Sequence, residues 1–240
     1  MGLPHECLLT GGGGVRLSPG AEGRLGGRDV RFAGGEPLVR RGLVDIVRRT
    51  AALEPRPETS LTTNALGLAK TAAALKEAGL DRVNVSLDTI RSDTFHEITR
   101  RDRYADVVAG LEAAQAAGLG PVKVNAVLLR GVNDEAAVLG ELMRALVECR
   151  IKPYYLHHGD LAPGTAHWRT GIDHGQDLMR AIHGRFSGLC QPAYVLDIPG
   201  GHGKSPIGPS YLTRVGGANG RARYDVEDFN GRHHAYPPPC

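Results

Sequence analysis

The amino-acid sequence predicts an α/β fold, an open, partial (β/α) barrel of about six parallel strands. Short β-branched runs alternate with longer stretches of helical apolar spacing, and several of those stretches end at a glycine such as Gly79 or Gly118. Repeated strand–helix units imply a parallel sheet, and about six strands are too few to close an eight-stranded barrel. A site for chemistry is therefore expected at the carboxyl ends of the strands.

The expected elements follow one another without long interruptions. The strand runs are short and rich in β-branched or aromatic residues, and they cover 30–33, 61–63, 83–87, 122–129, 154–156 and 194–198. The stretches between them repeat apolar residues every three or four positions and predict helices over 43–52, 65–78, 104–117, 135–149 and 176–183. Together these elements indicate one domain from residue 28 to residue 210.

Two segments flank this domain. Residues 1–27 contain the run Gly11–Gly14 and no sustained period, which predicts a flexible leader. That run lacks the Lys-Ser/Thr ending of a phosphate-binding loop, so we do not interpret it as one. Residues 211–240 are rich in Gly, His, Asn and Pro, and they predict an irregular tail on the surface.

Composition narrows the class of partner. The chain is 41% hydrophobic, which is enough for one sizeable core. Its formal net charge is +3, from 29 basic and 26 acidic residues, a balance that argues against nucleic acid and favours a small-molecule substrate. No run approaches the roughly 18 apolar residues of a membrane span, and no signal peptide is evident. We expect a cytoplasmic protein without a membrane partner, and its oligomeric state stays open.

Three residues near the end of the chain could take part in a reaction or bind a ligand. Asp160 and Asp197 each follow an apolar run, so their carboxylates are expected where a strand meets a loop. Lys204 lies seven residues past Asp197 (204 − 197), in a segment with three glycines. A lysine there could form a Schiff base with an aldehyde cofactor, and the two aspartates could hold an amine. An exposed turn with a solvated lysine is the alternative interpretation.

The segment from about Val127 to Tyr236 resembles lysine 2,3-aminomutases, radical enzymes that use S-adenosylmethionine (SAM), a [4Fe-4S] cluster and pyridoxal phosphate (PLP). Its matching pieces are Leu-Leu-Arg-Gly-Val-Asn-Asp, Lys-Pro-Tyr-Tyr-Leu-His-His-Gly-Asp-Leu, Ser-Gly-Leu-Cys-Gln-Pro and Pro-Gly-Gly-His-Gly-Lys-Ser-Pro. The resemblance implies that Lys204 is the catalytic lysine that binds PLP. It also implies that Asp160 and Asp197 bind the distal ammonium of a lysine-like amino acid, whose amino group migrates from C2 to C3.

Residues 28 to about 133 are similar to another radical SAM family, the GTP 3′,8-cyclase of molybdenum cofactor biosynthesis. The matching pieces include Gly-Gly-Glu-Pro-Leu-Val-Arg-Arg, Leu-Thr-Thr-Asn, Asp-Arg-Val-Asn-Val-Ser-Leu-Asp and Pro-Val-Lys-Val-Asn-Ala-Val. The positions that this resemblance assigns to SAM binding are Gly34, Gly35, Glu36, Thr63 and Ser86. The positions that it assigns to GTP are Arg40 or Arg41 and Lys123. From the residues alone, Thr63 could cap the next helix, and the arginine pair could be a solvated helix start.

The cysteines limit what either resemblance implies. Both families hold their cluster with a Cys-x-x-x-Cys-x-x-Cys loop, and no such loop occurs among the 240 residues. The four cysteines are dispersed, so no metal site is assigned to any residue. Our leading hypothesis is an aminomutase-like isomerase, inactive if the cluster is missing. The alternatives are a GTP 3′,8-cyclase, or a catalytically dead cofactor-binding or chimeric remnant with a family switch near 127–134.

Overall fold

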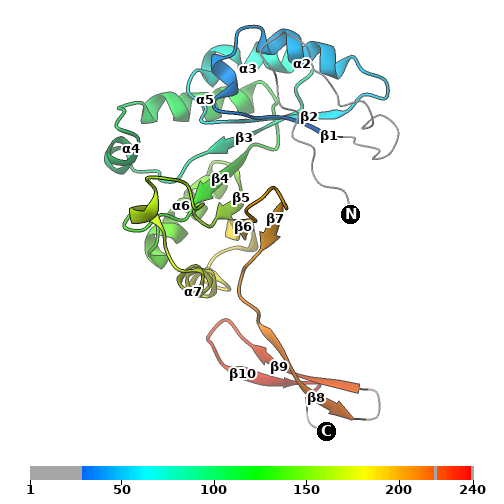
Figure 1. Cartoon of the computed structure of the whole chain (residues 1–240), viewed down its shortest axis with the longest axis vertical. Coiled ribbons are helices and arrows are strands. Elements are labelled where there is room, and N and C mark those ends of the chain that lie inside the picture. Colours follow the sequence, from blue (N-terminus) through cyan, green and yellow to red (C-terminus); the bar gives the residue numbers. More distant parts are fainter. Residues whose placement is uncertain (1–28, 219–220, 239–240) are drawn as a thin grey trace.

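A seven-stranded curled sheet forms the body of the protein (Figure 1). The computed structural model describes residues 29–218 and 221–238, so the leader predicted for 1–27 lies outside the described residues. The strands are β1 (Asp29–Phe32), β2 (Glu58–Thr63), β3 (Arg82–Ser86), β4 (Lys123–Val127), β5 (Lys152–His157), β6 (Ala193–Asp197) and β7 (Lys204–Pro206). They stand in sequence order, and β1 to β6 are all parallel. The predicted partial barrel of six parallel strands is confirmed, and β7 adds an antiparallel edge.

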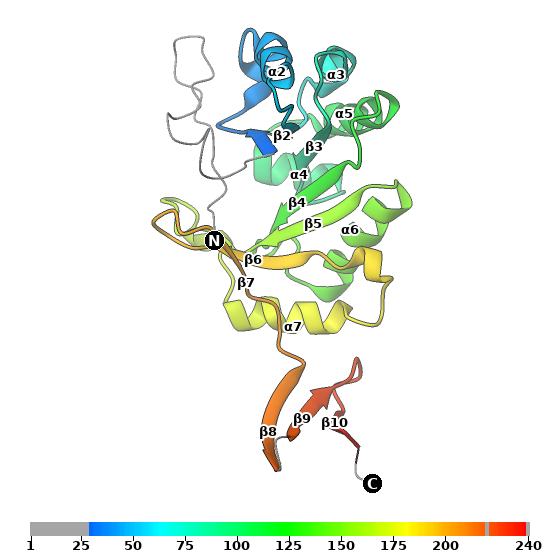
Figure 2. The ribbon, with the colours of Figure 1, turned by 90° about the vertical axis from the view of Figure 1, so that its right-hand side faces the viewer.

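The helices cover one face of this sheet (Figure 2). They are α2 (Leu43–Ala51), α3 (Leu68–Glu77), α4 (Ser92–Thr99), α5 (Tyr104–Ala116), α6 (Ala136–Glu148) and α7 (Ile172–Ile182), with short 3-10 turns η1 (Pro37–Val39), η2 (Ala166–Trp168) and η3 (Gly188–Cys190). The five predicted helices are present, and α4 is an addition. Its only buried residue is Phe95, so it has no apolar stripe that could have been recognised in the sequence.

Alternation along the strands separates an apolar face from a polar one. Val30 and Phe32 point to the helix layer, as do Val83 and Val85, and all four are buried. Leu61 and Leu156 are fully buried in the same core, against leucines of α3 and α6. The residues between them in each strand face the other way, into the hollow of the curled sheet. The core therefore lies on the convex side, and the concave side is left for polar side chains.

Helix packing against the sheet depends on small residues at close contacts. The clearest case is Gly175 in α7, where an added Cβ would lie 2.2 Å from the hydroxyl of Tyr194 on β6. Tyr194 is 2% exposed and its hydroxyl lies 2.8 Å from Nδ1 of His158. The absence of a side chain at Gly175 thus allows α7 to lie over the last parallel strand.

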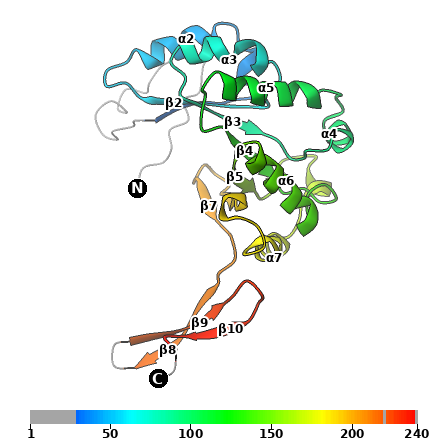
Figure 3. The same ribbon diagram turned by 180° about the vertical axis from the view of Figure 1, so that it is seen from behind.

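The C-terminal segment forms a second sheet. Strands β8 (Leu212–Ala218), β9 (Arg221–Glu227) and β10 (His233–Tyr236) pair antiparallel in the order β10-β9-β8 and project from the body (Figures 1 and 3). The prediction of an irregular tail over 211–240 is wrong for the described part of it. A register shift between Arg214 and Gly216 interrupts the alternation of β8, and both glycines of that strand weaken the strand pattern in the sequence.

Two further sequence predictions concern the chain as a whole. The segment 127–134, where a family switch was predicted, joins β4 to α6 inside one continuous sheet, because β4 pairs with both β3 and β5. The switch itself stays a prediction. Among the described residues, no helix combines the length and the apolar character that crossing a membrane requires.

Candidate functional site

The concave face of the curled sheet encloses a cavity of about 1550 Å³. Its walls come from β1, β2, β3, β5, β6 and β7, together with the loop that follows β5. Arg31, Ser60 and Arg82 line it from the first three strands, and Tyr155, Asp197 and Lys204 line it from the last three. The hollow of the half-barrel is therefore a candidate site, with cations at one side and an acid–base cluster at the other.

Strand register arranges the polar side chains of the first four strands in rows. Arg31 lies beside Ser60, and Ser60 lies beside Arg82. The next row toward the carboxyl ends contains Thr62, Asn84 and Lys123. Each row runs across neighbouring strands about 4.8 Å apart. Arg31 and Arg82 thus line the cavity from β1 and β3, and Lys123 of β4 lies one row further toward the carboxyl ends.

The three cations differ in how they are held. Arg82 pairs at the rim with Asp29 at 3.2 Å and with Glu58. Lys123 Nζ lies 4.3 Å from the ring centroid of Tyr154, a cation–π contact that leaves its charge available to an anion. Arg31 opens on the cavity. Sequence reasoning missed Arg31 and Arg82, although the place of Arg31 between Val30 and Phe32 was a usable signal.

The glycine–glycine–glutamate segment after β1 is held by its glutamate. The carboxylate of Glu36 accepts hydrogen bonds from Leu38 N at 3.0 Å, Thr63 Oγ1 at 2.7 Å and Asn64 N at 2.8 Å. Glu36 is thus the N-cap of η1 and ties the end of β1 to the end of β2. Thr63 is 2% exposed, and its hydroxyl is occupied by this contact and by Ala65 N. Glu36 and Thr63 position the segment rather than opening on the cavity.

The backbone beside them is open. An added Cβ at Gly34 or Gly35 would meet nothing within 4 Å, and Gly34 has a φ of 153°, which favours glycine. Ser86, at the carboxyl end of β3, is exposed and shares a face with Asn84. A ligand could therefore approach this edge closely, which fits the SAM contacts predicted for Gly34, Gly35 and Ser86.

The predicted arginine pair does not lie on a strand of the concave face. Arg40 and Arg41 follow η1 and precede α2, so they belong to the connection into the helix layer rather than to a strand of the concave face. Arg41 is exposed, and Arg40 Nε is buried without a partner among the described residues. Of the predicted GTP contacts, only Lys123 stands in the concave rows.

An acid–base cluster joins β5, β6 and β7. Asp197 lies with Oδ2 3.0 Å from Nδ1 of His157 and with Oδ1 in contact with Nζ of Lys204. Burial alone would raise the pKa of Asp197, but the hydrogen bonds and charges of Lys204 and His157 together lower it. Burial lowers the pKa of His157, and the charge of Lys204 lowers it further. The three groups satisfy one another within the chain.

This pairing bears on the predicted PLP site. Lys204 is in β7, opposite Asp197 in the register, rather than on a free loop. Asp160 lines the same cavity but is exposed, and its backbone carbonyl accepts from Nε of Arg169 at 3.0 Å. The structure therefore brings Asp160, Asp197 and Lys204 to one cavity, yet it joins the lysine to the aspartate that was expected to bind a substrate ammonium.

The cysteines of the described ranges do not fit a cluster. Cys149 follows α6 and Cys190 ends η3, so they precede β5 and β6 and lie at the amino ends of the strands. Gly34 and Ser86 lie at the opposite edge. Within 29–218 and 221–238 there is no group of three or more His, Cys, Asp or Glu placed to hold a metal ion. These residues thus offer no set of thiolates for a [4Fe-4S] cluster.

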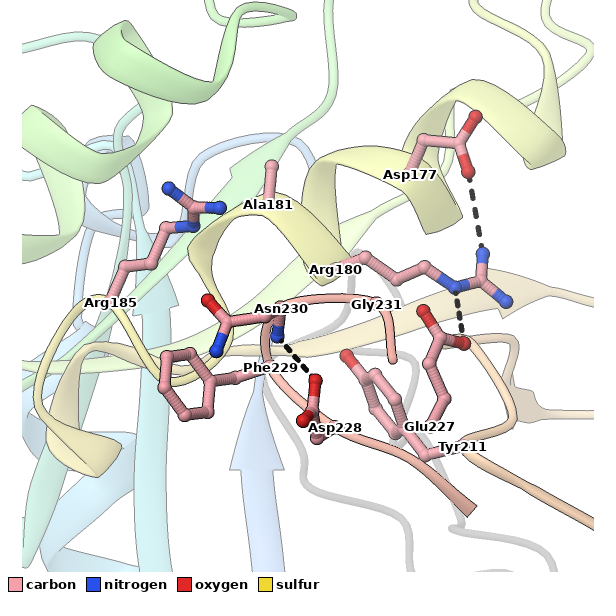
Figure 4. A pocket seen from close by; sticks show the side chains of 10 residues that line it. All are labelled: Asp177, Arg180, Ala181, Arg185, Tyr211, Glu227, Asp228, Phe229, Asn230 and Gly231. Atoms are coloured by element: carbon pink, nitrogen blue, oxygen red, sulfur yellow. Dashed lines mark hydrogen bonds and ion pairs between the residues drawn. The ribbon is translucent and has the colours of Figure 1, made fainter. Parts of the chain in front are cut away.

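A smaller cavity of about 280 Å³ lies between α7 and the C-terminal sheet (Figure 4). Arg180 of α7 lies 3.3 Å from Asp177 Oδ1 and 3.3 Å from Glu227 Oε2 of β9. Phe229 packs on the end of α7, where an added Cβ at Gly184 would lie 2.4 Å from that of Phe229. These contacts hold the second sheet to the body.

Comparison with known proteins identifies the class to which the fold belongs. The family model of the radical SAM superfamily matches residues 21–142, half of the chain. The chain belongs to the radical SAM superfamily. Among solved structures it is similar to a radical SAM methyltransferase from Sphaerobacter thermophilus, with a TM-score of 0.58, 18% identity, and coverage of 70% of this chain and 51% of that one. This likeness shows the fold.

The most similar curated relatives include two named GTP 3′,8-cyclase. The protein from Streptomyces coelicolor is 51% identical over 184 residues, which cover 77% of this chain and 53% of that protein. The protein from Mycobacterium sp. strain KMS is 58% identical over 139 residues, which cover 57% of this chain and 40% of that protein. The chain spans about half the length of the curated relatives it matches.

These relatives overturn the leading hypothesis. Relatives at 48–58% identity are named GTP 3′,8-cyclase, so the expectation of a lysine 2,3-aminomutase, an isomerase that uses PLP, is wrong. The pairing of Lys204 with Asp197 agrees with this correction, because a lysine held by a carboxylate is not poised for an aldehyde. The superfamily implies SAM and a [4Fe-4S] cluster. The open backbone at Gly34 and Gly35 fits the binding of SAM.

Proposed function

We propose that this chain binds GTP in the concave cavity, as the half-barrel of a GTP 3′,8-cyclase-type radical SAM protein. The observation that carries the proposal is the pair of arginines, Arg31 and Arg82, that line one cavity from β1 and β3, with Lys123 of β4 one row further along the same face of the sheet. The names of the most similar relatives support the same substrate.

The cations suit a triphosphate. Arginine and lysine bind phosphate oxygens through charge-assisted hydrogen bonds, and arginine does so with two parallel donors. Arg82 already has carboxylate neighbours at the rim, so Arg31 and Lys123 offer the less compensated charges. Side chains on strands are also held more rigidly than side chains on loops, which favours a defined position for the phosphates.

The carboxyl edge of β1 and β3 is the proposed SAM site. The backbone at Gly34 and Gly35 would approach the amino-acid part of SAM, and the hydroxyl of Ser86 would hydrogen-bond to it from the next strand but one. The chemistry that SAM supplies in this superfamily is hydrogen-atom abstraction by a 5′-deoxyadenosyl radical. Glu36 and Thr63 are proposed to keep that edge in place through their mutual hydrogen bond.

Calorimetric titration with GTP and Mg²⁺ tests the proposal. Lys123→Ala should weaken GTP binding about tenfold, equivalent to ~1.4 kcal/mol. Lys70→Ala is the matched control, because Lys70 is exposed on α3 in the helix layer and should leave binding unchanged. A protein that is folded by circular dichroism yet takes up no GTP would overturn the proposal.

A further inference from the structure

The lining of the concave cavity changes in character from one side to the other. From β1 to β3 it consists of Asp29, Arg31, Ser60 and Arg82, which are all polar. Every apolar or aromatic side chain of the lining comes from residues 154–199, which run from β5 to the loop after β6. A ligand that matches both parts has a charged end and an apolar end, as a purine nucleotide has.

The apolar half of the cavity also contains a carboxylate without an internal partner. Three aspartates line the cavity. Asp29 lies 3.2 Å from Arg82, and Asp197 is in contact with Lys204. Within the described ranges, the carboxylate of Asp160 forms neither an ion pair nor a hydrogen bond, and the residue is exposed. Asp160 is therefore the lining carboxylate that a ligand can reach without breaking an existing ion pair.

The backbone of Asp160 is fixed, although its carboxylate is free. Its carbonyl oxygen accepts from Nε of Arg169 at 3.0 Å and from Oγ1 of Thr165 at 3.3 Å. Nη2 of Arg169 also donates to the carbonyl of Ala162 at 2.7 Å, so one guanidinium holds the segment 160–162 at both ends. A side chain on a segment held in this way meets a ligand from a defined position.

The chemistry of a carboxylate determines which part of a nucleotide suits Asp160. An ionised carboxylate only accepts hydrogen bonds, so the group beside it must be a donor. Guanine carries two neighbouring donors on its Watson–Crick edge, N1–H and the 2-amino group, and the two oxygens of one carboxylate can accept from both. Adenine has one donor and one acceptor on that edge, and the acceptor would face a carboxylate oxygen. Asp160 thus fits guanine and disfavours adenine.

We propose that Asp160 binds the guanine base of the nucleotide through N1–H and the 2-amino group. The base lies in the apolar half of the cavity, and the phosphates extend toward Arg31, which forms no ion pair among the described residues. This inference rests on the proposed function, and it adds the orientation of the nucleotide and a residue that selects the base. SAM also carries amino groups that can donate to a carboxylate, and the experiment separates the two sources.

The test compares GTP, ITP and ATP by calorimetry on the wild type and on Asp160→Asn. ITP lacks only the 2-amino group of GTP, and the wild type should bind GTP about tenfold more tightly than ITP or ATP. In Asp160→Asn an amide N–H₂ replaces one acceptor, so the preference for GTP over ITP should disappear. An amide offers one donor and one acceptor, as adenine does, so ATP should bind the variant more tightly than it binds the wild type. A misfolded variant cannot produce that gain.

Two control variants separate recognition of the base from the effect of charge. Asp93→Asn makes the same change of charge at an exposed position of α4 in the helix layer and should alter no nucleotide affinity. Arg31→Ala should weaken GTP, ITP and ATP by the same factor, because all three carry the same triphosphate. The ratio of the GTP and ITP affinities should therefore change only in Asp160→Asn.

The outcomes distinguish the inference from the proposed function. If the wild type binds GTP no more tightly than ITP, or if Asp160→Asn weakens all three nucleotides by one factor, the inference is overturned and the proposed function stands. If Asp160→Asn weakens SAM and leaves the ratio of GTP to ITP unchanged, the carboxylate belongs to SAM, and the inference again fails. If no nucleotide binds to the folded wild type, the proposed function fails and the inference fails with it.

Discussion

Asp88 should make this fold less stable at neutral pH than at acid pH, and Asp88→Asn should remove that difference. The residue follows β3 at the carboxyl edge of the sheet, where its carboxylate accepts a hydrogen bond from Val127 N at 2.7 Å. Burial raises the pKa of Asp88 to about 6, against a smaller opposing effect of that hydrogen bond. Asparagine keeps an acceptor for Val127 N and carries no charge.

The magnitude follows from linkage between protonation and folding. The reference pKa of the carboxyl is 3.8, so the folded state raises it by about two units, and each unit corresponds to about 1.36 kcal/mol. Because the folded state binds this proton more tightly, the stabilisation is complete below a pH of about 4 and is lost as the pH rises through about 6. Allowing for partial solvent access of a half-buried side chain, we expect roughly 2 kcal/mol.

Urea denaturation at pH 4, 6 and 7.5 measures the effect. The free energy of unfolding of Asp88→Asn should match that of the wild type at pH 4 within about 0.5 kcal/mol and exceed it by roughly 2 kcal/mol at pH 7.5. Asp102→Asn changes an exposed carboxylate and should show no such trend. A variant that is less stable than the wild type at pH 7.5 would refute the reasoning, since the ionised carboxylate would then be stabilising.

Three further substitutions test the contacts around the site. Glu36→Ala removes the acceptor of three hydrogen bonds and should lower the free energy of unfolding by about 2 kcal/mol or more, and a change below about 0.5 kcal/mol in urea would contradict its positioning role. Gly175→Ala places a methyl group against Tyr194 and should lower the free energy of unfolding by about 1–3 kcal/mol. Gly171→Ala is the control, because an added Cβ there meets nothing within 4 Å and should change stability little. Equal melting temperatures of the two variants would argue against the close contact. Phe229→Ala should release the C-terminal sheet, so limited proteolysis should cut near 207–211 faster than in the wild type, and unchanged cleavage would count against that anchor.

The parallel strands could be predicted from the sequence because each is a short run that contains β-branched or aromatic residues. Strand β7 could not, since Lys204–Pro206 is a strand only through its pairing with β6. The C-terminal sheet had one local signal, the dipeptide Asn-Gly at 219–220, which is typical of a hairpin. Our sequence analysis did not use that signal and relied on the Gly-, His-, Asn- and Pro-rich composition of 211–240.

Some features of the candidate site could likewise be predicted from the sequence, and others could not. The alternation in Val30–Phe32 and Val83–Val85 was enough to place Arg31 and Asn84 on the face opposite the core. The contact between Glu36 and Thr63 joins residues 27 positions apart, and no local pattern shows that the threonine hydroxyl is already occupied. The sequence therefore indicated which segments meet at the carboxyl edge, but not which polar atoms there remain available to a ligand.

The pairing of polar atoms within the fold also bears on the aminomutase resemblance of residues 127–236, which led to a wrong prediction. The aminomutase resemblance assigned ligand-binding roles to Lys204 and Asp197, yet in the fold these two side chains neutralise each other, with His157 on the second carboxylate oxygen. A cluster that satisfies its own charges gains little from a ligand, because binding would first have to break an existing ion pair. Among the described residues, Arg31 forms no ion pair, and it lines the same cavity from β1. A charge that is free to bind an anion therefore remains on β1, a strand that lies within the matched radical SAM segment.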